Sequence, residues 1–513
     1  MNRYRKGNKD QILLYSSALD DRLPEDDEVY GFDTLIDNID ISAIEKTYSK
    51  EGGLCFPPRT MIKVIFYAYR KGIFSSRKIA WATRSIIQFI YLCGDLPIAH
   101  RTISDFRANH GPALKQIFQE IVRIGYRIGI ITGKFGYQDG VKIKANASDS
   151  AFKSKSEWEK ESEELKEDIE NYFAKCIAND KEEDNLYGKD NDSSKISYER
   201  TKFNQKVLDL ISLEKEESKS DSNEKQEIIE KAIRYEKIEK VLDSNQDAEK
   251  DTKLNLTDSD TRFMKSHGKI EGSYNGQAIT ENQFITAADV TTDATDFAQV
   301  DSLVQQHKET LMETKLENYG ADAGYFSGKN LKYLEDSQIE AFIPESKEHL
   351  IDNSTESFVP SSFQYNEDND EYICPNNEIL DFMRTDFVEG KERHIYGAKV
   401  GVCMNCPQHE SCLKSKHDKQ VGYRTLQADE YTPYRQEAYR RIREESGIEF
   451  YRKRKIEPES VFGNIRNNMG FKKFMTRGIE RVKGEFMIMS SVHNISKILK
   501  YLAANPQKAT ALL

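Results

Sequence analysis

The stretch Tyr319-Gly320-Ala321-Asp322-Ala323-Gly324-Tyr325 places one aspartate among small residues, just after an amphipathic run at 297–316. Small flanking residues allow a backbone or a metal ion to approach the Asp322 carboxylate closely. A second aspartate, Asp139, lies in segment 137–143, whose apolar and polar residues alternate as in a half-buried strand. A third acid, Glu459, follows a basic run and opens a predicted helix. Two strand aspartates and one helix glutamate favour a single two-metal phosphoryl-transfer site, and the alternative is three ordinary surface carboxylates.

Length and composition limit the classes of protein to consider. A chain of 513 residues is expected to form two to four domains. The net charge of -11 argues against a uniformly basic nucleic-acid coat, although local basic surfaces remain compatible with it. No apolar run reaches the 18 residues of a membrane helix, and the basic N-terminus lacks a signal-peptide core. We therefore expect a cytoplasmic protein without a membrane partner.

Residues 1–130 read as a helical domain. An apolar pattern at 60–71 follows two prolines that suit a helix start, and shorter helices are expected after it. The segment 100–107 follows a turn and carries Arg101 and Arg107. It resembles the DNA-reading helix of a helix-turn-helix, so DNA binding and dimerisation are expected here. The alternative is a helical bundle that only packs or dimerises.

The middle of the chain reads as an α/β core with one insertion. Segments 131–151 and 256–345 contain predicted strands and helices in alternation, with a turn at 274–277 and strands at 283–290, around Asp322 and at 341–344. Between them, residues 152–255 are rich in acids and lysines and nearly free of glycine. Apolar spacing there predicts a helical hairpin, and a structural or dimerising arm is the simplest role for it.

Seven cysteines are present, and four of them lie in a second insertion at 346–433. Cys403 and Cys406 form a C-x2-C pair that Cys374 and Cys412 could complete as a four-thiolate zinc site. A small loop-rich insertion would gain stability from such a site. Reduced free thiols and an iron–sulfur cluster are the alternatives. The cysteines at 55, 93 and 176 are expected to be buried apolar residues.

The final segment, 434–513, is basic before and after Glu459 and ends in an apolar helix that completes the core. Proline at 458 suits a helix start, and Arg466 follows Glu459 by seven residues, which predicts the same helix face. A carboxylate among cations fits a site that also binds phosphates, although an arginine paired with a surface acid is the alternative for Arg466. The DNA contacts expected in this segment are Arg452, Arg454, Lys455, Arg466, Lys472 and Lys473.

Four blocks together resemble the bacterial DDE insertion-sequence transposases. They are the N-terminal Phe56–Met61 stretch, the first-aspartate block 139–148, the second-aspartate block 321–325 and the glutamate block 459–466. The family's Y-x2-R-x3-E-x6-K signature keeps its spacing from Glu459 to Arg466, with Arg in place of Lys. Lys455 and Arg452 stand where Arg and Tyr are expected, and Tyr451 is one residue away. The cysteine insertion, together with Asp258, Asp260, Tyr274, Asn275 and Gln277, resembles one subgroup.

The resemblance implies a ribonuclease H-like catalytic core with a mixed sheet, preceded by an all-α domain. It implies a transposase that binds transposon ends, cleaves phosphodiester bonds and transfers strands, with Asp139, Asp322 and Glu459 as catalytic metal ligands. Two Mg2+ or Mn2+ ions per site suit carboxylate ligands. Double-stranded DNA and a second copy of the chain are the expected partners. The alternatives are a transposase-derived DNA-binding protein without catalysis and a ribonuclease H-like nuclease without strand transfer.

Overall fold

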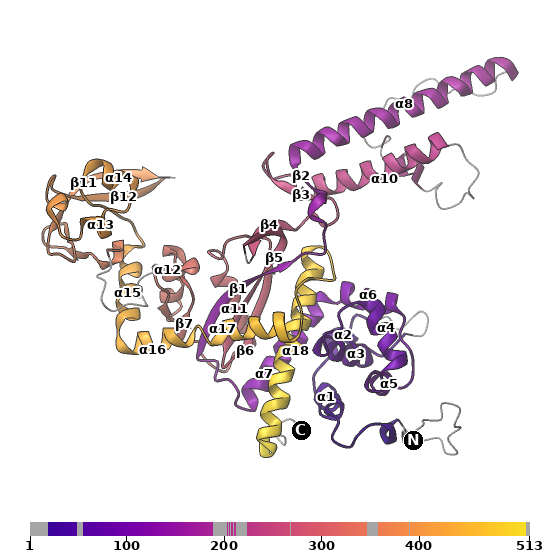
Figure 1. The fold of residues 1–513 in the computed structure, drawn as a ribbon, viewed down its shortest axis with the longest axis horizontal. Helices are drawn as coiled ribbons and strands as arrows, with labels where there is room; N and C mark the ends of the chain where they lie inside the picture. Colours follow the sequence, from indigo (N-terminus) through magenta and orange to yellow (C-terminus); the bar gives the residue numbers. More distant parts are fainter. Residues whose placement is uncertain are drawn as a thin grey trace, which may run out of the picture. The chain divides into compact units, whose positions relative to one another are not determined.

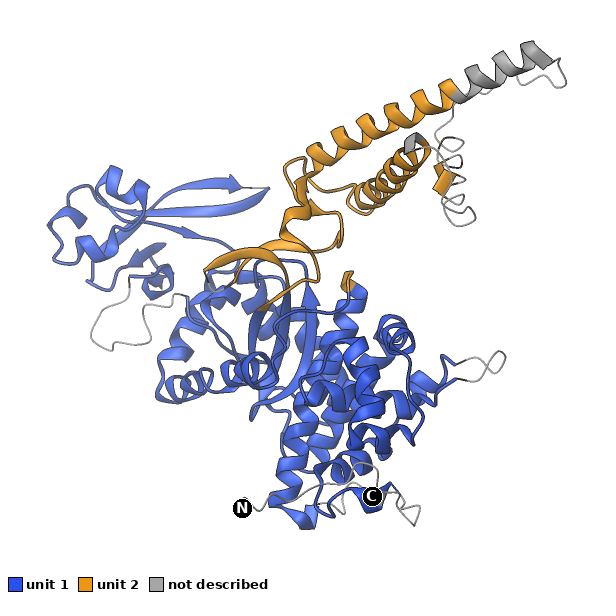
Figure 2. Ribbon diagram, turned by 45° about the vertical axis from the view of Figure 1, so that its right-hand side comes forward, with its two compact units in different colours: residues 1–141, 275–476, 480–513 blue, residues 142–274, 477–479 orange. Residues whose placement is uncertain are grey.

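The computed structural model describes residues 19–48, 55–187, 223–266, 268–345, 358–388 and 390–508, and single positions within 203–211; side chains at 176–187 and 223–224 are outside the description. The chain divides into two compact units (Figure 2). The first contains residues 1–141, 275–476 and 480–513, and the second contains 142–274 and 477–479. Strands β1 (Phe135–Lys144) and β5 (Lys269–Glu281) run through the boundary between them.

The first unit begins with a group of helices (Figure 1). Pro57 and Pro58 precede or open α3, which suits a helix start because the first turn lacks acceptors for those N–H groups. Gly94 ends α5 in the left-handed conformation, with φ of 62°. The helices are α1 (Glu28–Asp37), α2 (Ser42–Glu45), α3 (Pro58–Arg70), α4 (Ser76–Ser85), α5 (Ile87–Cys93), α6 (His100–Asn109) and α7 (Gly111–Arg127).

The core of the first unit is a mixed sheet in the order β6-β5-β1-β7-β8. Strand β6 (Phe284–Thr291) pairs antiparallel with β5, whereas β7 (Asn318–Gly320) is parallel to both β1 and β8 (Glu340–Phe342). Helices α11 (Val300–Thr310) and α12 (Gly328–Asp336) connect the strands that follow β6, and their apolar faces share one buried cluster with β7 and β8. The long α18 (Ile479–Ala504) closes the unit.

Strand β6 has its outer edge covered by polar side chains from helices. Asn494 of α18 accepts from the Ile285 N–H at 2.9 Å and donates to the Ile285 carbonyl at 2.7 Å. Gln306 of α11 accepts from the Ala288 N–H at 3.1 Å. These side chains supply the partners that a neighbouring strand would otherwise supply, so the edge is satisfied without one.

The cysteine-bearing insertion is a five-stranded antiparallel sheet in the order β13-β12-β11-β10-β9. It has its own small core, which includes Phe363, Leu380 and Tyr396. The expectation of a loop-rich insertion is therefore wrong. Its strands are β9 (Gln364–Asn366), β10 (Glu371–Ile373), β11 (Ile379–Val388), β12 (Lys391–Ala398) and β13 (Thr425–Ala428).

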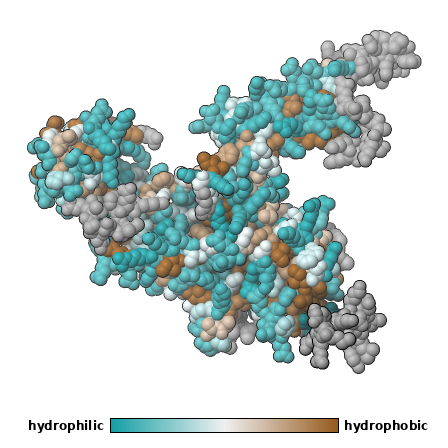
Figure 3. Space-filling view, viewed as in Figure 1, coloured by the Kyte–Doolittle hydropathy of each residue, from teal (hydrophilic) through white to brown (hydrophobic). Residues whose placement is uncertain are grey.

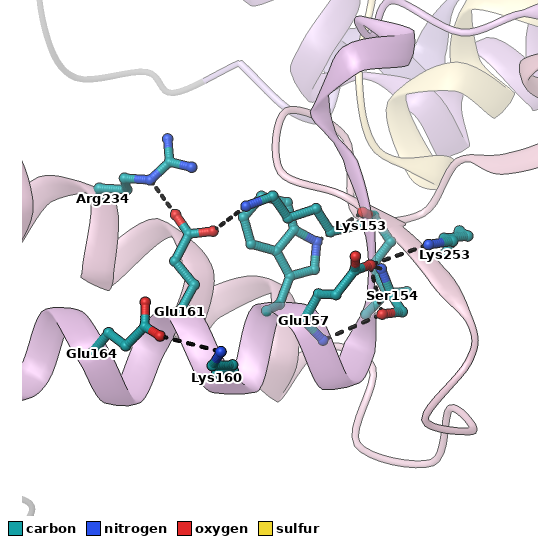
Figure 4. A network of polar contacts seen from close by, with 10 residues as sticks. Lys153, Ser154, Glu157, Lys160, Glu161, Glu164, Arg234 and Lys253 are labelled. Carbon is teal, nitrogen blue, oxygen red and sulfur yellow. Dashed lines mark hydrogen bonds and ion pairs between the residues drawn. The ribbon is translucent and has the colours of Figure 1, made fainter.

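The second unit contains the acidic helical segment. Helix α8 (Lys155–Tyr187) packs against α10 (Asn223–Asp243), and short strands β2 (Phe152–Ser154) and β3 (Lys253–Asn255) pair at their base (Figure 1). Ser154 and Glu157 form a capping box at the start of α8: the serine hydroxyl donates to Glu157 and accepts from its N–H (Figure 4). Strand β4 (Arg262–Ser266) pairs with the first half of β5. The visible face of the hairpin is largely hydrophilic, as the composition predicted (Figure 3).

Other sequence expectations differ from the structure in local ways. The predicted turn at 274–277 lies inside β5, where buried neighbours on both faces favour extended backbone. The helix predicted at 297–316 is limited to α11, which ends at Thr310. Cys93 is buried as expected, whereas Cys55 is exposed; the side chain of Cys176 lies outside the described residues.

Arg107 is buried rather than available to DNA, which corrects the interpretation of α6 as a helix that reads DNA with both arginines. Its guanidinium donates to the Tyr69 hydroxyl at 2.9 Å and to the Phe74 carbonyl at 2.8 Å. Tyr69 in turn donates to the fully buried Glu485 of α18 at 2.6 Å. Glu485 also accepts from the backbone N–H groups of Met475 and Thr476. A buried cation and a buried anion thus share one hydroxyl, which links α3 and α6 to α18.

Replacing Arg107 by Met should lower the free energy of unfolding by about 3 kcal/mol or more, because it removes the cation from a buried charge network that retains its anion. Urea unfolding of the full chain measures this. Arg101→Met is the matched control, since Arg101 is 89% exposed and its loss should change stability by less than about 0.5 kcal/mol. Unchanged stability with weakened DNA binding in Arg107→Met would restore the DNA-contact interpretation.

Candidate active site

Asp139 lies midway along β1 and is four-fifths buried. The Gly140 N–H donates to its Oδ1 at 2.8 Å. A Cβ at position 140 would lie 2.3 Å from Gln277 Nε2 and 2.9 Å from Asp296 Oδ1. Only glycine leaves room for these two side chains, so the residue after Asp139 is fixed by what the neighbouring β5 brings to the same place.

Asp322 lies immediately after β7 rather than within a strand as predicted. It caps a short 3-10 turn, where its Oδ1 accepts from the Gly324 N–H at 2.7 Å. A Cβ at position 324 would lie 2.8 Å from that same oxygen. The small flanks that drew attention to Asp322 therefore have a physical role, because they allow the backbone to fold closely over the carboxylate.

The structure brings Asp139 and Asp322 together at Arg454. One guanidinium nitrogen, Nη2, lies 3.3 Å from Asp139 Oδ2 and 3.6 Å from Asp322 Oδ2. Their neighbourhood follows from the sheet, since β1 and β7 are parallel neighbours and the chain leaves β7 just before Asp322. The Arg454 side chain is 10% exposed and its backbone follows α16 (Glu445–Lys453).

Burial raises the pKa of Asp139 to about 6, above its ordinary value of 3.8. Arg454 and the Gly140 N–H lower it, whereas the negative charges of Asp322 and Asp296 raise it further. Burial also raises the pKa of Tyr451, which lies close enough to Arg454, Asp139 and Asp322 to feel their charges. One carboxylate that resists ionisation, with two further acids and one cation beside it, is the electrostatic setting of a cation-binding or proton-handling site.

Asp296, which the sequence analysis did not single out, lies beside this pair. Its Oδ1 accepts from Asn275 Nδ2 at 2.7 Å and from Gln277 Nε2 at 2.6 Å. Its charge contributes to raising the pKa of Asp139. Asn275 and Gln277 belong to the block that resembles one transposase subgroup, and in the structure both bind Asp296. A signal was present: Asp296 follows shortly after β6, and polar residues after sheet strands often converge on a site.

A buried amide network lies next to these carboxylates. Gln138 donates to Gln277 at 3.1 Å and accepts from the Tyr319 hydroxyl at 2.6 Å, and the Tyr325 hydroxyl donates to the same Gln277 oxygen at 2.6 Å. Both tyrosines are fully buried. Since Gln277 also donates to Asp296, the network fixes the position of that carboxylate through hydrogen bonds from three strands, β1, β5 and β7, and from the turn after β7.

Glu459 is separate from the aspartate pair in this structure. It is exposed in the first turn of α17 (Glu457–Gly463) and makes no hydrogen bond or ion pair with any described residue. Five residues of chain separate it from Arg454, which limits the distance between their Cα atoms to at most about 18 Å. Within the described ranges, no group of three or more His, Cys, Asp or Glu side chains is arranged to hold a metal ion.

The neighbouring Glu457 has a structural role instead. Its Oε2 accepts from the Gln283 N–H at 2.6 Å, in the turn between β5 and β6. Burial raises the pKa of its carboxyl group. The two glutamates of α17 therefore differ in environment, with Glu457 packed against the sheet and Glu459 facing solvent.

The predicted DNA contacts fall into three groups. Arg101, Arg452, Lys455 and Lys472 are exposed, and Arg466 and Lys473 are half-buried. Arg107 and Arg454 are buried, so Arg454 belongs to the carboxylate site and is corrected from a surface contact to a site residue. Arg466 lies in a π-helical turn, Asn464–Asn468, that follows α17. Because a π turn is wider than an α turn, α-helical spacing alone does not decide whether Arg466 shares the face of Glu459, and this stays a prediction.

Two segments of the chain match family models. Residues 373–499 match a model described as Transposase DDE domain, and residues 17–109 match one described as Transposase domain (DUF772). The two matches indicate an insertion-sequence DDE transposase. No curated protein and no solved structure matches the chain.

The transposase matches cover particular parts of the site. The DDE-domain match contains Arg454, Glu459 and all four cysteines of the insertion, whereas Asp139 and Asp322 lie outside it. The N-terminal transposase match covers α1 to α6. Among the helices of the described residues, none is both long and apolar enough to cross a membrane.

The four cysteines within the DDE-domain match gather around one cavity of about 30 Å³. Cys374 Sγ accepts from the N–H groups of Asn376 and Glu378 at 3.3 and 3.2 Å, and Cys403 Sγ accepts from the Arg424 N–H at 3.4 Å. Burial raises the pKa of Cys412 to about 11, and the other three thiols raise it further. Four convergent sulfurs with backbone N–H donors are a donor set that suits zinc, although they are not at coordinating distances here.

A larger cleft of about 1060 Å³ lies elsewhere in the first unit, between the starts of α12 and α15 (Thr432–Arg443) and strand β12. Tyrosines and both signs of charge line it. Its charges are largely paired with one another: Arg435 binds Asp429 through two nitrogens, and Lys391 binds Glu430 at 2.9 Å. The size of this cleft is therefore no indication of where the transposase chemistry takes place.

Asp139→Asn should stabilise the protein above pH 7. Because the folded pKa of about 6 exceeds the ordinary 3.8, protonated Asp139 contributes stability that is complete below pH 3.8 and lost as the pH rises through 6. The shift corresponds to about 3 kcal/mol, so the variant should exceed wild type by up to that amount at pH 8, with the difference shrinking toward pH 4. Urea unfolding at a series of pH values measures this.

Glu313→Gln, which removes the charge of an exposed acid, controls for net charge and should show no such pH-dependent gain. Parallel stability curves for Asp139→Asn and wild type between pH 4 and pH 8 would show that the Asp139 carboxylate is not held against its ionisation.

Proposed function

We propose that this transposase binds the ends of its element in double-stranded DNA and catalyses metal-dependent phosphodiester cleavage and strand transfer. The observation that carries the proposal is the buried pair Asp139 and Asp322, held together at Arg454. Carboxylates that are buried side by side destabilise a fold. Their presence therefore favours a functional role over a structural one. The DDE-domain match supplies the class of reaction that such a pair serves.

The residues that would hold divalent metal are Asp139, Asp322 and Glu459. Their oxygen donors fit Mg2+ or Mn2+, and the raised pKa of Asp139 means that a nearby cation would favour its ionised form. Two such ions, when bound, would activate the attacking hydroxyl and stabilise the leaving oxygen. In this chain Arg454 neutralises part of the carboxylate charge, and the amide network fixes Asp296 beside the pair.

The arrangement of strands supports a ribonuclease H-like core for this function. An antiparallel pair, β5 and β6, is followed by the parallel strands β1, β7 and β8, with helices between the later strands. Glu459 would join the site from α17, which lies next to the sheet through the Glu457–Gln283 bond. Movement of α17 or of the Glu459 side chain toward Asp139 would complete the three-carboxylate set.

Alanine at Asp139, Asp322 or Glu459 should abolish cleavage of a duplex that carries the element's terminal repeat, while binding of that duplex stays within about threefold of wild type. The reason is that these carboxylates act on the metal, whereas cations bind the phosphates. A gel assay of cleavage with Mg2+, paired with binding measured in EDTA, separates the two effects.

Glu457→Ala is the matched control on the same helix turn. It should lower stability, since it leaves the Gln283 N–H without its partner, yet retain cleavage at a temperature where the protein is folded. Wild-type cleavage by any of the three site variants would remove that residue from the proposed site. Cleavage without joining of strands would assign a nuclease, and DNA binding without cleavage would assign a DNA-binding protein.

The cysteine cluster is proposed to hold one structural zinc ion through Cys374, Cys403, Cys406 and Cys412. Elemental analysis of the purified protein should give about one zinc per chain, and Cys403→Ser with Cys406→Ser should remove it and lower the protease resistance of residues 358–433. Cys55→Ser and Cys93→Ser lie outside the cluster and should keep the zinc. Folded, active protein without zinc would contradict this assignment.

A further inference from the structure

Helix α4 presents an exposed tryptophan between basic residues. Trp81 is 60% exposed, and Arg77, Lys78 and Arg84 on the same helix are also exposed. Positions 77, 81 and 84 are four and three residues apart, so they lie in one row along the helix surface, with Lys78 next to it. A tryptophan flanked by cations presents a flat apolar surface beside positive charge, a combination that is enriched at interaction surfaces.

Among the described residues, the cations of α4 are also unpaired, in contrast to those on and next to α3. Arg77, Lys78 and Arg84 make no hydrogen bond or ion pair with any residue that the structure describes. On α3, Lys63 binds Asp33 and Asp37, whereas Arg70 and the residue that follows the helix, Lys71, both bind Glu28. The described part of the helical domain thus binds the cations of α3 internally and leaves three positive charges on α4, in a chain whose net charge is -11.

Helix α6, which the sequence analysis favoured as the DNA-reading helix, exposes less positive charge than α4. It packs against α4 and is drawn beside it (Figure 1). Of its two arginines, Arg107 is buried and Arg101 lies 3.8 Å from Asp105 of the same helix. The solvent side of α6 therefore carries nearly balanced charge, whereas that of α4 carries three cations and an indole.

We propose that the α4 face, defined as Arg77, Lys78, Trp81 and Arg84, is the surface by which the N-terminal domain contacts double-stranded DNA. This inference rests on the proposed function. The three cations would bind phosphates, and the flat indole would pack against a deoxyribose or base edge between them. The major groove of B-DNA is wide enough to admit an α-helix, so the α4 face can approach phosphates and base edges there.

Intrinsic fluorescence tests the surface directly, because the chain has two tryptophans and the other, Trp158, is 2% exposed. The full chain is titrated in EDTA with a 30-base-pair duplex of arbitrary sequence. We expect wild-type emission to change on binding and the change to be absent in Trp81→Phe. A change that depends on protein concentration without DNA would overturn the proposal and assign the face to contact between copies.

Charge variants provide the second measurement. Combined Arg77→Gln, Lys78→Gln and Arg84→Gln should weaken duplex binding at least tenfold at 0.1 M salt and lower the slope of log affinity against log salt by about 2 to 3. The matched control removes three exposed lysines from the acidic hairpin, Lys160→Gln, Lys237→Gln and Lys240→Gln, with the same change in net charge. It should lower the slope by less than 1. The single variant Arg84→Gln, expected to lower the slope by about 1, replaces the triple variant if that one does not fold.

The outcomes separate this inference from the proposed function. Wild type that binds no duplex DNA would overturn both. If wild type binds and cleaves DNA, two results would overturn the α4 surface alone. These are an unchanged salt slope in the α4 variant and an emission of Trp81 that does not change when DNA binds. An equal loss of slope in the α4 and hairpin variants would also overturn it, since the effect would then belong to net charge.

Discussion

Asp139 and Asp322 both contact the guanidinium of Arg454, and this contact depends on the arrangement of the sheet in the first unit. Asp139 comes from the middle of β1 and Asp322 from the end of β7, and Arg454 reaches both from a segment more than a hundred residues further along the chain. Burial disfavours the charged form of Asp139, so bringing these groups together costs electrostatic free energy. The packing of β1, β7 and the segment after α16 must offset that cost. The glycines that flank the two acids and the amide network beside them are explained by the same requirement, since each makes room for a carboxylate or fixes its neighbour.

The N-terminal helices depend on a second buried charge, Glu485. That carboxylate binds a tyrosine hydroxyl and two backbone N–H groups, and Arg107 approaches through the same hydroxyl. The helix that carries Glu485 also carries Asn494, which bonds to β6. One long helix therefore touches the sheet and the helical domain with polar side chains along its length. Such contacts fix orientation more strictly than apolar packing, because an unsatisfied partner in either place destabilises the fold.

Sequence patterns predicted elements well where periodicity was strong and poorly where tertiary contacts decided. The helix at 58–70 and the strand around Asp139 follow from local spacing. The pattern 274–277 looked like a turn because it contains Asn and Gly, yet both faces of β5 are covered, which overrides local preference.

Asp139 and Asp322 were identified from their surroundings, whereas Asp296 was not, since its importance comes from Gln277 and Asn275 across the sheet. Arg107 was misassigned because a sequence shows its charge but not its burial. The π turn after Glu459 likewise has no signal in residue spacing.

The covered edge of β6 has a consequence for how copies of this protein could associate. With Asn494 bonded to both backbone groups of Ile285 and Gln306 bonded to Ala288, a strand from another molecule would have to displace side chains that already satisfy the backbone. The outer edge of β6 is therefore a poor site for adding a strand, and sheets that continue from one molecule into another are disfavoured there.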